Sequence, residues 1–179
     1  MNIQRRAIRG IVATPLLGIG VVLGGFPTAA AQPDYGTWPV DPNVITDSTA
    51  YTAAAPVMNP DGQTGVTAVY THRDGSRQIT NTILVFADPA AATAASNGSD
   101  ISEFVVGGNE QPATVGANGK ITTGSSPDGS QSVSVLEFTE GNAAATIAFE
   151  GPPNDPVPVE LVTEYGQRQD GAIKGASSE

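Results

Sequence analysis

Two strand-like runs flank a turn in this chain: VTAVYTH at Val66–His72 and QITNTILVFA at Gln78–Ala87, with RDGS at Arg73–Ser76 between them. Apolar and polar residues alternate in the first run, and β-branched and aromatic residues dominate the second. Both patterns are typical of β-strands. An Asp-Gly pair between two such runs favours a tight turn. The stretch therefore predicts an antiparallel β-hairpin.

A helix is predicted directly after this hairpin. Asp88-Pro89 precedes the alanine-rich run AAATAAS at 90–96. Aspartate is a preferred N-cap residue and proline a preferred first helical residue. Asn97-Gly98 can interrupt the helix, 100–104 can continue or restart it, and Gly107-Gly108 ends the element.

Three further strands and a second helix complete the predicted fold. SVSVLEFT at 132–139 and AAATIAFE at 143–150 alternate, and a weaker, glycine-rich strand is expected over 114–124. Asp155-Pro156 repeats the pattern of a capping aspartate followed by proline, and apolar residues from Leu161 onward recur at helical spacing. We expect an α+β fold in the order ββ-α-βββ-α, with an antiparallel sheet of about five strands and helices packed on one side.

The first 31 residues have the layout of a secretory signal peptide. Arginines at positions 5, 6 and 9 precede the uncharged run 11–25, and Ala29–Ala31 offers small residues to a signal peptidase. An uncleaved membrane anchor is the alternative, but the apolar run is shorter than the roughly 20 residues that a spanning helix requires. We therefore expect cleavage near Ala31, no stable membrane anchor, and a protein that is secreted or located in the cell envelope.

The remainder divides into three predicted parts: a proline-rich N-terminal arm (32–64), the α+β domain (65–175) and a flexible tail (176–179). The arm carries Tyr35 and Trp38, which a purely disordered linker rarely contains. We expect part of the arm to pack on the domain, to cover a sheet edge, and to border the largest, mainly apolar groove. Trp38, Tyr35 and Tyr70 are accordingly the candidate ligand-binding residues.

Composition excludes several classes of function. The chain has 179 residues, 18 acidic against 8 basic side chains, a net charge of −10 and no cysteine. An acidic protein repels nucleic-acid phosphates. Without cysteine there is no disulfide, thiolate metal site or iron–sulfur cluster, and a single histidine does not predict a metal centre. We expect no cofactor and no nucleic-acid partner.

His72, the only histidine, is the one candidate for catalysis. Asp74 and Ser76 lie close by in sequence, so a secreted hydrolase using His72 is possible in chemical terms. However, aspartate and serine in such turns usually hydrogen-bond their own backbone, and no G-x-S-x-G motif is present. The sequence therefore favours a non-catalytic protein and a surface-turn role for His72.

Three segments resemble exported actinobacterial proteins, mycobacterial ones especially. They are the runs VTAVYTHRDGSRQITNTILVFADPAAATAA, SPDGSQSVSVLEFTEGNAAATIAFEGPPNDPVP and LVTEYGQRQDGAIKG. Their order over Gly65 to Gly175 is similar to that of PknH-like extracellular sensor domains and of LpqN-like lipoproteins with a PsbP-like fold. This chain lacks the lipobox cysteine and the disulfide cysteines of those families. The resemblance implies a binding or envelope-associated role, with an apolar envelope molecule or a protein as the partner.

Overall fold

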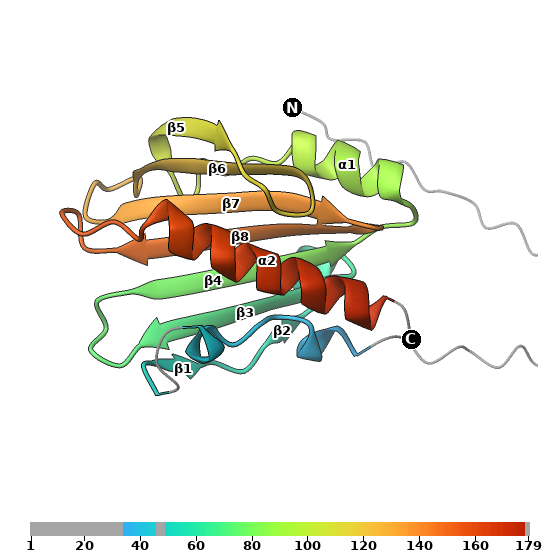
Figure 1. Ribbon diagram of the computed structural model, residues 1–179, viewed down its shortest axis with the longest axis horizontal. Coiled ribbons are helices and arrows are strands. Elements are labelled where there is room, and N and C mark those ends of the chain that lie inside the picture. Colours follow the sequence, from blue (N-terminus) through green and yellow to red (C-terminus); the bar gives the residue numbers. More distant parts are fainter. Residues whose placement is uncertain (1–33, 46–48, 178–179) are drawn as a thin grey trace, which may run out of the picture. The chain divides into compact units, whose positions relative to one another are not determined.

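The computed structural model describes residues 34–45 and 49–177, which belong to one compact unit. They form an antiparallel sheet with the order β1-β3-β4-β8-β7-β6-β5, and β2 pairs with the same edge of β3 as β1 (Figure 1). The strands are β1 (Tyr51–Ala53), β2 (Val57–Met58), β3 (Gly65–His72), β4 (Gln78–Val85), β5 (Val106–Pro112), β6 (Ala117–Ser125), β7 (Ser132–Glu140) and β8 (Ala143–Gly151). The helices are α1 (Pro89–Asn97) and α2 (Val159–Ala176), with 3-10 turns η1 (Tyr35–Thr37), η2 (Pro42–Val44) and η3 (Pro60–Gly62).

The predicted α+β class, the antiparallel sheet and its first hairpin are confirmed. β3 pairs with β4 in an unbroken register from Gly65 opposite Leu84 to Thr71 opposite Gln78. β7 and β8 form a second regular hairpin, and β8 pairs with β4 at the centre of the sheet. The strongest sequence alternation thus lies in the central strands.

The expected strand count of about five was wrong, because the sheet has eight strands. β1 and β2 have three and two residues, which is too short for an alternating pattern to be recognised. β5 reads VGGNEQP, and its glycines and proline conceal a strand whose register shifts between Val106 and Asn109. The strand predicted over 114–124 begins at Ala117 in the structure, because the residues before it form the turn that connects β5 to β6.

α1 begins as the sequence predicts. Asp88 is its N-cap, and the Asp88 carboxylate accepts a hydrogen bond of 2.8 Å from the Ala91 backbone N–H. The helix ends at Asn97. The segment 100–104 does not continue it but turns, with the Phe104 N–H donating to the Ile101 carbonyl.

α2 does not begin at the predicted aspartate cap. Its N-cap is Pro158, with no side-chain capping bond, and the Asp155 carboxylate pairs instead with Arg77. The residue before a proline is disfavoured in the helical region. Val157 precedes Pro158, so the helix cannot extend back to Asp155.

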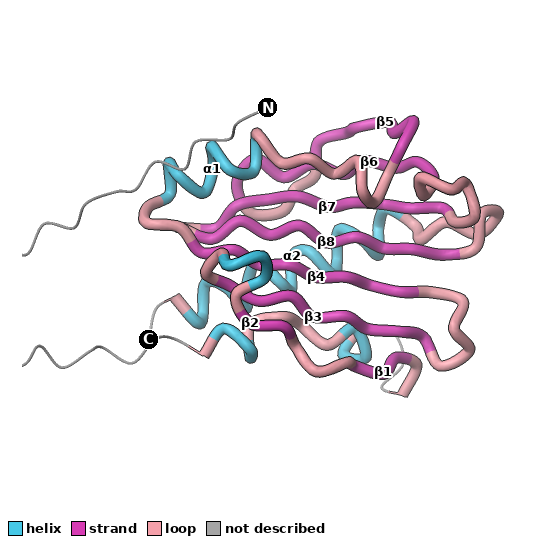
Figure 2. Tube along the Cα trace, turned by 180° about the vertical axis from the view of Figure 1, so that it is seen from behind, coloured by secondary structure: helices cyan, strands magenta, loops and turns pink. Residues whose placement is uncertain are grey.

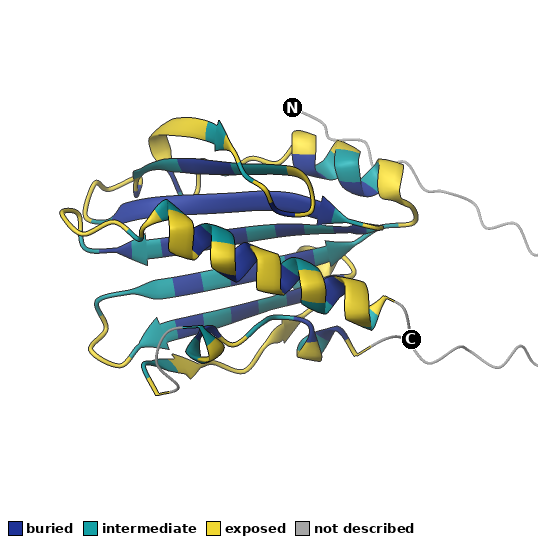
Figure 3. Ribbon diagram, viewed as in Figure 1, coloured by how far each residue is buried: buried dark blue, intermediate teal, exposed yellow. Residues whose placement is uncertain are grey.

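The two faces of the sheet are covered differently. α2 crosses one face, over a core that includes Ile83, Leu136 and Phe138 (Figures 1 and 3). On the other face, α1 contacts β7 and β8, and Val105 packs with Val133 and other side chains of these two strands. Seen from behind, this second face lies in front of α2 (Figure 2). The expectation that the helices pack on one side is therefore wrong, because α2 and α1 lie on opposite faces. β7 is consequently buried on both faces.

The N-terminal arm packs into the core on the α2 face. Tyr35 and Trp38 are buried, with their rings edge-on at a centroid distance of 4.9 Å. Further along, β1 and β2 occupy the free edge of β3. The predicted signal peptide at 1–31 lies outside the described residues. Of the predicted tail 176–179, Ala176 closes α2, and 178–179 also lie outside the described residues.

Candidate functional site

A groove of about 350 Å³ lies where the arm, the ends of the central strands and the start of α2 meet. The arm contributes Pro42 and Ile45, so it borders this groove as the sequence predicts. Most of the wall is apolar. The remaining lining residues are Ala50, Tyr51, His72, Arg77, Ile79, Phe149, Val157, Pro158, Leu161 and Tyr165.

The sheet and α2 form the apolar walls. Ile79 and Phe149 are cross-strand partners on β4 and β8, and both are buried. Tyr165 stacks edge-on against Phe149 at 5.4 Å between ring centroids. Leu161, in the first turn of α2, remains 39% exposed. The exposed part of Leu161 thus adds apolar surface to the groove lining.

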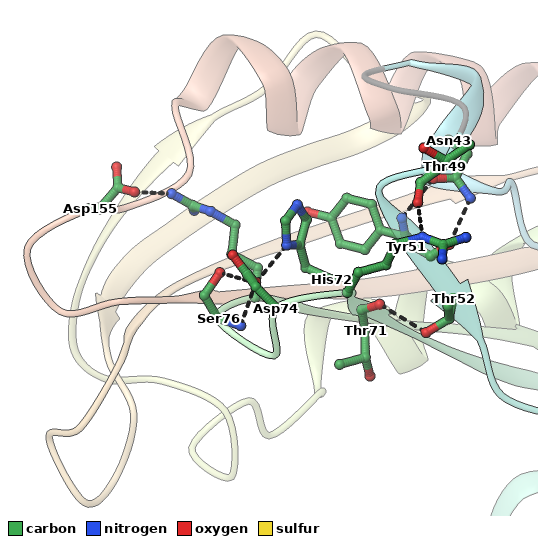
Figure 4. Close-up of polar contacts among 11 residues, drawn as sticks. Asn43, Thr49, Tyr51, Thr52, Thr71, His72, Asp74, Ser76 and Asp155 are labelled. Atoms are coloured by element: carbon green, nitrogen blue, oxygen red, sulfur yellow. Dashed lines mark hydrogen bonds and ion pairs between the residues drawn. The ribbon is translucent and has the colours of Figure 1, made fainter.

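Four side chains with polar groups line the same groove: Tyr51, His72, Arg77 and Tyr165, whose hydroxyl donates to the Val40 carbonyl. His72 is the last residue of β3, and its ring lies edge-on to that of Tyr51 at 5.2 Å (Figure 4). Its Nδ1 lies 2.6 Å from Oδ1 of Asp74. With Nδ1–H donating to that carboxylate, Nε2 is the imidazole nitrogen that remains for a ligand.

The same Asp74 oxygen binds Ser76. The Ser76 N–H donates to it at 2.8 Å and the Ser76 hydroxyl at 2.6 Å (Figure 4). These bonds from Ser76, followed by that from His72, hold the Asp74 pKa well below its ordinary value. Since the Ser76 hydroxyl donates to Asp74 and not to His72, the three residues do not form a Ser-His-Asp triad. His72 therefore has an orienting carboxylate, and Ser76 is not positioned as its nucleophile.

Arg77 crosses from the hairpin loop to the segment before α2. Its guanidinium forms an ion pair with Asp155 (Figure 4), and the side chain is 21% exposed. A Cβ at position 151 would lie 2.8 Å from a guanidinium nitrogen, so Gly151 leaves the space that Arg77 occupies. Burial raises the pKa of Tyr51, and the nearby charge of Arg77 opposes that rise. The Arg77 cation and the Tyr51 side chain thus line the same groove.

Of the residues singled out from the sequence, His72 lines the groove, whereas the three candidate ligand-binding residues Trp38, Tyr35 and Tyr70 are not among its lining residues. Trp38 and Tyr35 are buried in the core, and the Tyr70 hydroxyl donates to the Pro39 carbonyl at 3.3 Å. The sequence analysis missed Tyr51 and Arg77. The run H-R-D-G-S-R at 72–77 is the local signal for Arg77, because it places two arginines shortly after the one histidine, but it says nothing of Tyr51.

A buried hydrogen-bond cluster, the arm clamp, fixes the arm on this face. It consists of Asn81, Tyr165 and Gln169. The Gln169 amide accepts from the Val40 N–H and donates to the Trp38 carbonyl, both at 2.8 Å. The Tyr165 hydroxyl donates to the Val40 carbonyl at 2.6 Å. The clamp therefore fixes the arm just before Pro42 and Ile45 reach the groove.

No family model, curated protein or solved structure matches this chain. Within 34–45 and 49–177, no helix has the length and hydropathy that a membrane crossing requires. Over those same residues, no group of three or more histidine or carboxylate side chains converges as a metal site would need.

Proposed function

We propose that this protein is a secreted or envelope-associated binding protein that holds a small amphiphile in the apolar groove without transforming it. The observation that carries the proposal is the groove itself, with aliphatic walls and polar groups limited to a few side chains. Its volume of about 350 Å³ lies in the range of ligand pockets, about 300 to 1,000 Å³. Such a lining favours a ligand with an apolar body and one polar group.

Burial of an aliphatic chain supplies the driving force in this proposal. Each methylene transferred from water contributes about 0.8 kcal/mol. Eight buried methylenes then contribute roughly 6 kcal/mol before the costs of immobilising the ligand. The arm clamp lowers those costs, because the wall formed by Pro42 and Ile45 is already ordered by hydrogen bonds to the preceding residues.

The second candidate function is a secreted hydrolase using His72. The hydrogen bond from His72 to Asp74 favours it, since a carboxylate orients the base in many hydrolases. Binding without turnover has the stronger support, because the hydroxyl of Ser76 is bonded to Asp74. Turnover of short-chain aryl esters that is abolished in His72→Ala would favour the hydrolase over our proposal.

Titration with the neutral fluorophore N-phenyl-1-naphthylamine tests binding in the groove. We expect enhanced emission with the native protein and an affinity at least about 10-fold lower for Leu161→Asp, because the aspartate places a charge in the apolar wall. Val106→Asp is the matched control: Val106 is 43% exposed on β5 and is not among the lining residues. Absence of emission enhancement, or equal loss in both variants, would contradict the proposal.

A further inference from the structure

We infer that the groove selects amphiphiles with an anionic head group, bound by Arg77 and His72 with the Tyr51 hydroxyl, while the apolar body contacts Ile79 and Leu161. This inference rests on the proposed function and names the ligand class for the same groove.

The distribution of charge favours an anion at this place. The chain has a net charge of −10, and eight of its residues are lysine or arginine. Five of these lie among the described residues, and two of the five, Arg73 and Arg77, flank the turn that follows His72. Arg77 is the one of these five that lines the groove, and its positive charge attracts anionic ligands although Asp74 and Asp155 lie beside it.

The donors at the groove also fit an anion. Among the hydrogen bonds and ion pairs of the described residues, the Arg77 guanidinium has Asp155 as its single partner, although it carries five N–H donors. The Asp155 side chain is 69% exposed, and an ion pair with such an exposed partner contributes little. A guanidinium binds carboxylate or phosphate with two parallel hydrogen bonds. Arg77 can thus bind a ligand head group at small cost.

A cationic head group fits the same place poorly. The carboxylate closest to His72 is Asp74, and one of its oxygens already accepts from Ser76 twice and lies against His72. An ammonium group in the groove would face Arg77, and like charges repel. A neutral ester would leave the partly buried guanidinium without a new charged partner.

The test compares ligands with one chain and different heads. Decanoate, decyl phosphate, methyl decanoate and decylamine are each tested for displacement of the fluorophore from the native protein. We expect both anions to bind at least about 10-fold more tightly than the methyl ester, as hydrogen bonds to charged groups predict, and the amine to bind weakest. Arg77→Gln should reduce the ratio of decanoate to ester affinity to near one, and Arg77→Lys should retain part of it.

Arg168→Gln provides the control, since Arg168 is an exposed arginine on α2 that pairs with Glu164 outside the groove. It should leave the ratio unchanged, and thermal melting verifies that each variant is folded. If Arg77→Gln does not fold, the ratio of decanoate to ester affinity is measured with Arg77→Lys and with His72→Gln instead. The head-group inference requires that this ratio be lower in both variants than in the native protein. Equal affinity of the native protein for decanoate and its ester would overturn the head-group inference but leave groove binding intact. Failure of all four ligands and of the fluorophore would instead overturn the proposed function.

Discussion

The two faces of the sheet each contain a polar cluster built around a buried side chain, and the two clusters differ in charge. On the α2 face, the neutral arm clamp joins Asn81 to Tyr165 at 3.1 Å and to Gln169 at 2.7 Å. On the other face, the Glu137 carboxylate is 1% exposed and pairs with the Lys120 ammonium at 3.2 Å. We call this second group the ion cluster; it also includes Glu110, at 3.4 Å from Lys120, and the Ser99 hydroxyl, which donates to Glu137.

The difference indicates how each face holds its covering segment. The clamp binds the arm through uncharged groups, and the bonds from Tyr165 and Gln169 to the arm backbone offset part of the cost of their burial. The ion cluster anchors Ser99, two residues beyond the end of α1, through a carboxylate removed from water, and such a charge is costly unless it stays paired. Removing one partner of the ion cluster should therefore destabilise the protein more than removing one partner of the clamp. The intact ion pair nevertheless contributes less net stability than the intact clamp, because burying its charges is costly.

The largest expected effect is that of Lys120→Met. This variant leaves the Glu137 carboxylate buried without its cation, and we expect a loss of about 4 kcal/mol in the free energy of unfolding. Urea denaturation followed by circular dichroism measures it. Arg168→Met removes an exposed pair with Glu164 and should cost less than about 1 kcal/mol.

The double variant Lys120→Met with Glu137→Leu sharpens this comparison. Replacing a buried pair by apolar side chains is often neutral, so most of the lost stability should return. If the double variant is no more stable than Lys120→Met, the ion cluster contributes stability of its own and the contrast with the clamp is wrong.

The next largest effect is that of Gln169→Ala in the clamp. The Val40 N–H, the Trp38 carbonyl and the Asn81 amide each lose a partner, and we expect a loss of about 3 kcal/mol in unfolding free energy. Emission from Trp38, the only tryptophan, should shift to longer wavelength in the folded variant because the arm loosens. Gln167→Ala is the control, since Gln167 is exposed and donates one bond of 3.3 Å. An unchanged Trp38 spectrum would contradict the clamp's role in holding the arm.

The sequence predicted the regular parts of this fold because their signals are local. Alternation over eight or nine residues marks β3, β4, β7 and β8, and the Asp88 cap marks α1. The edge strands escaped prediction because their pairing depends on distant residues: β1 forms only against the end of β3. The same reason explains why Asp155 was wrongly predicted to cap α2. It pairs instead with Arg77, which lies 78 positions away in the sequence.

The candidate site was predictable only in part for a related reason. The aromatic residues of the arm correctly indicated that it packs beside a groove, since Tyr35 and Trp38 are buried and Pro42 and Ile45 line the wall. Which side chains face the groove depends on three-dimensional contacts. Trp38 points into the core, whereas Tyr51, in an unpredicted strand, reaches the lining.

The smallest expected effect is that of Tyr70→Phe; Tyr70 donates to the arm at Pro39, and its contribution to stability depends on pH. Burial raises the pKa of Tyr70 to about 12, with a further contribution from Asp41, and an unfolded tyrosine titrates near about 10. Between these values the native state holds the proton that the unfolded chain has lost, so stability falls as the pH rises above about 10. Tyr70→Phe loses the 3.3 Å bond to Pro39 and should cost about 1 kcal/mol at neutral pH.

In alkali this cost should shrink, because the phenylalanine variant lacks the titrating group. Urea denaturation at pH 8 and at a pH near 11 measures both values. Burial lowers the pKa of Lys120, but bonds and charges from Glu137 and Glu110 outweigh it and raise the pKa overall, so the ion cluster also loses stability in this window. Lys120→Met removes only the part of the alkaline loss of stability that comes from deprotonation of Lys120. If Tyr70→Phe and the native protein lose stability in parallel up to the higher pH, Tyr70 is not the group whose ionisation weakens the α2 face.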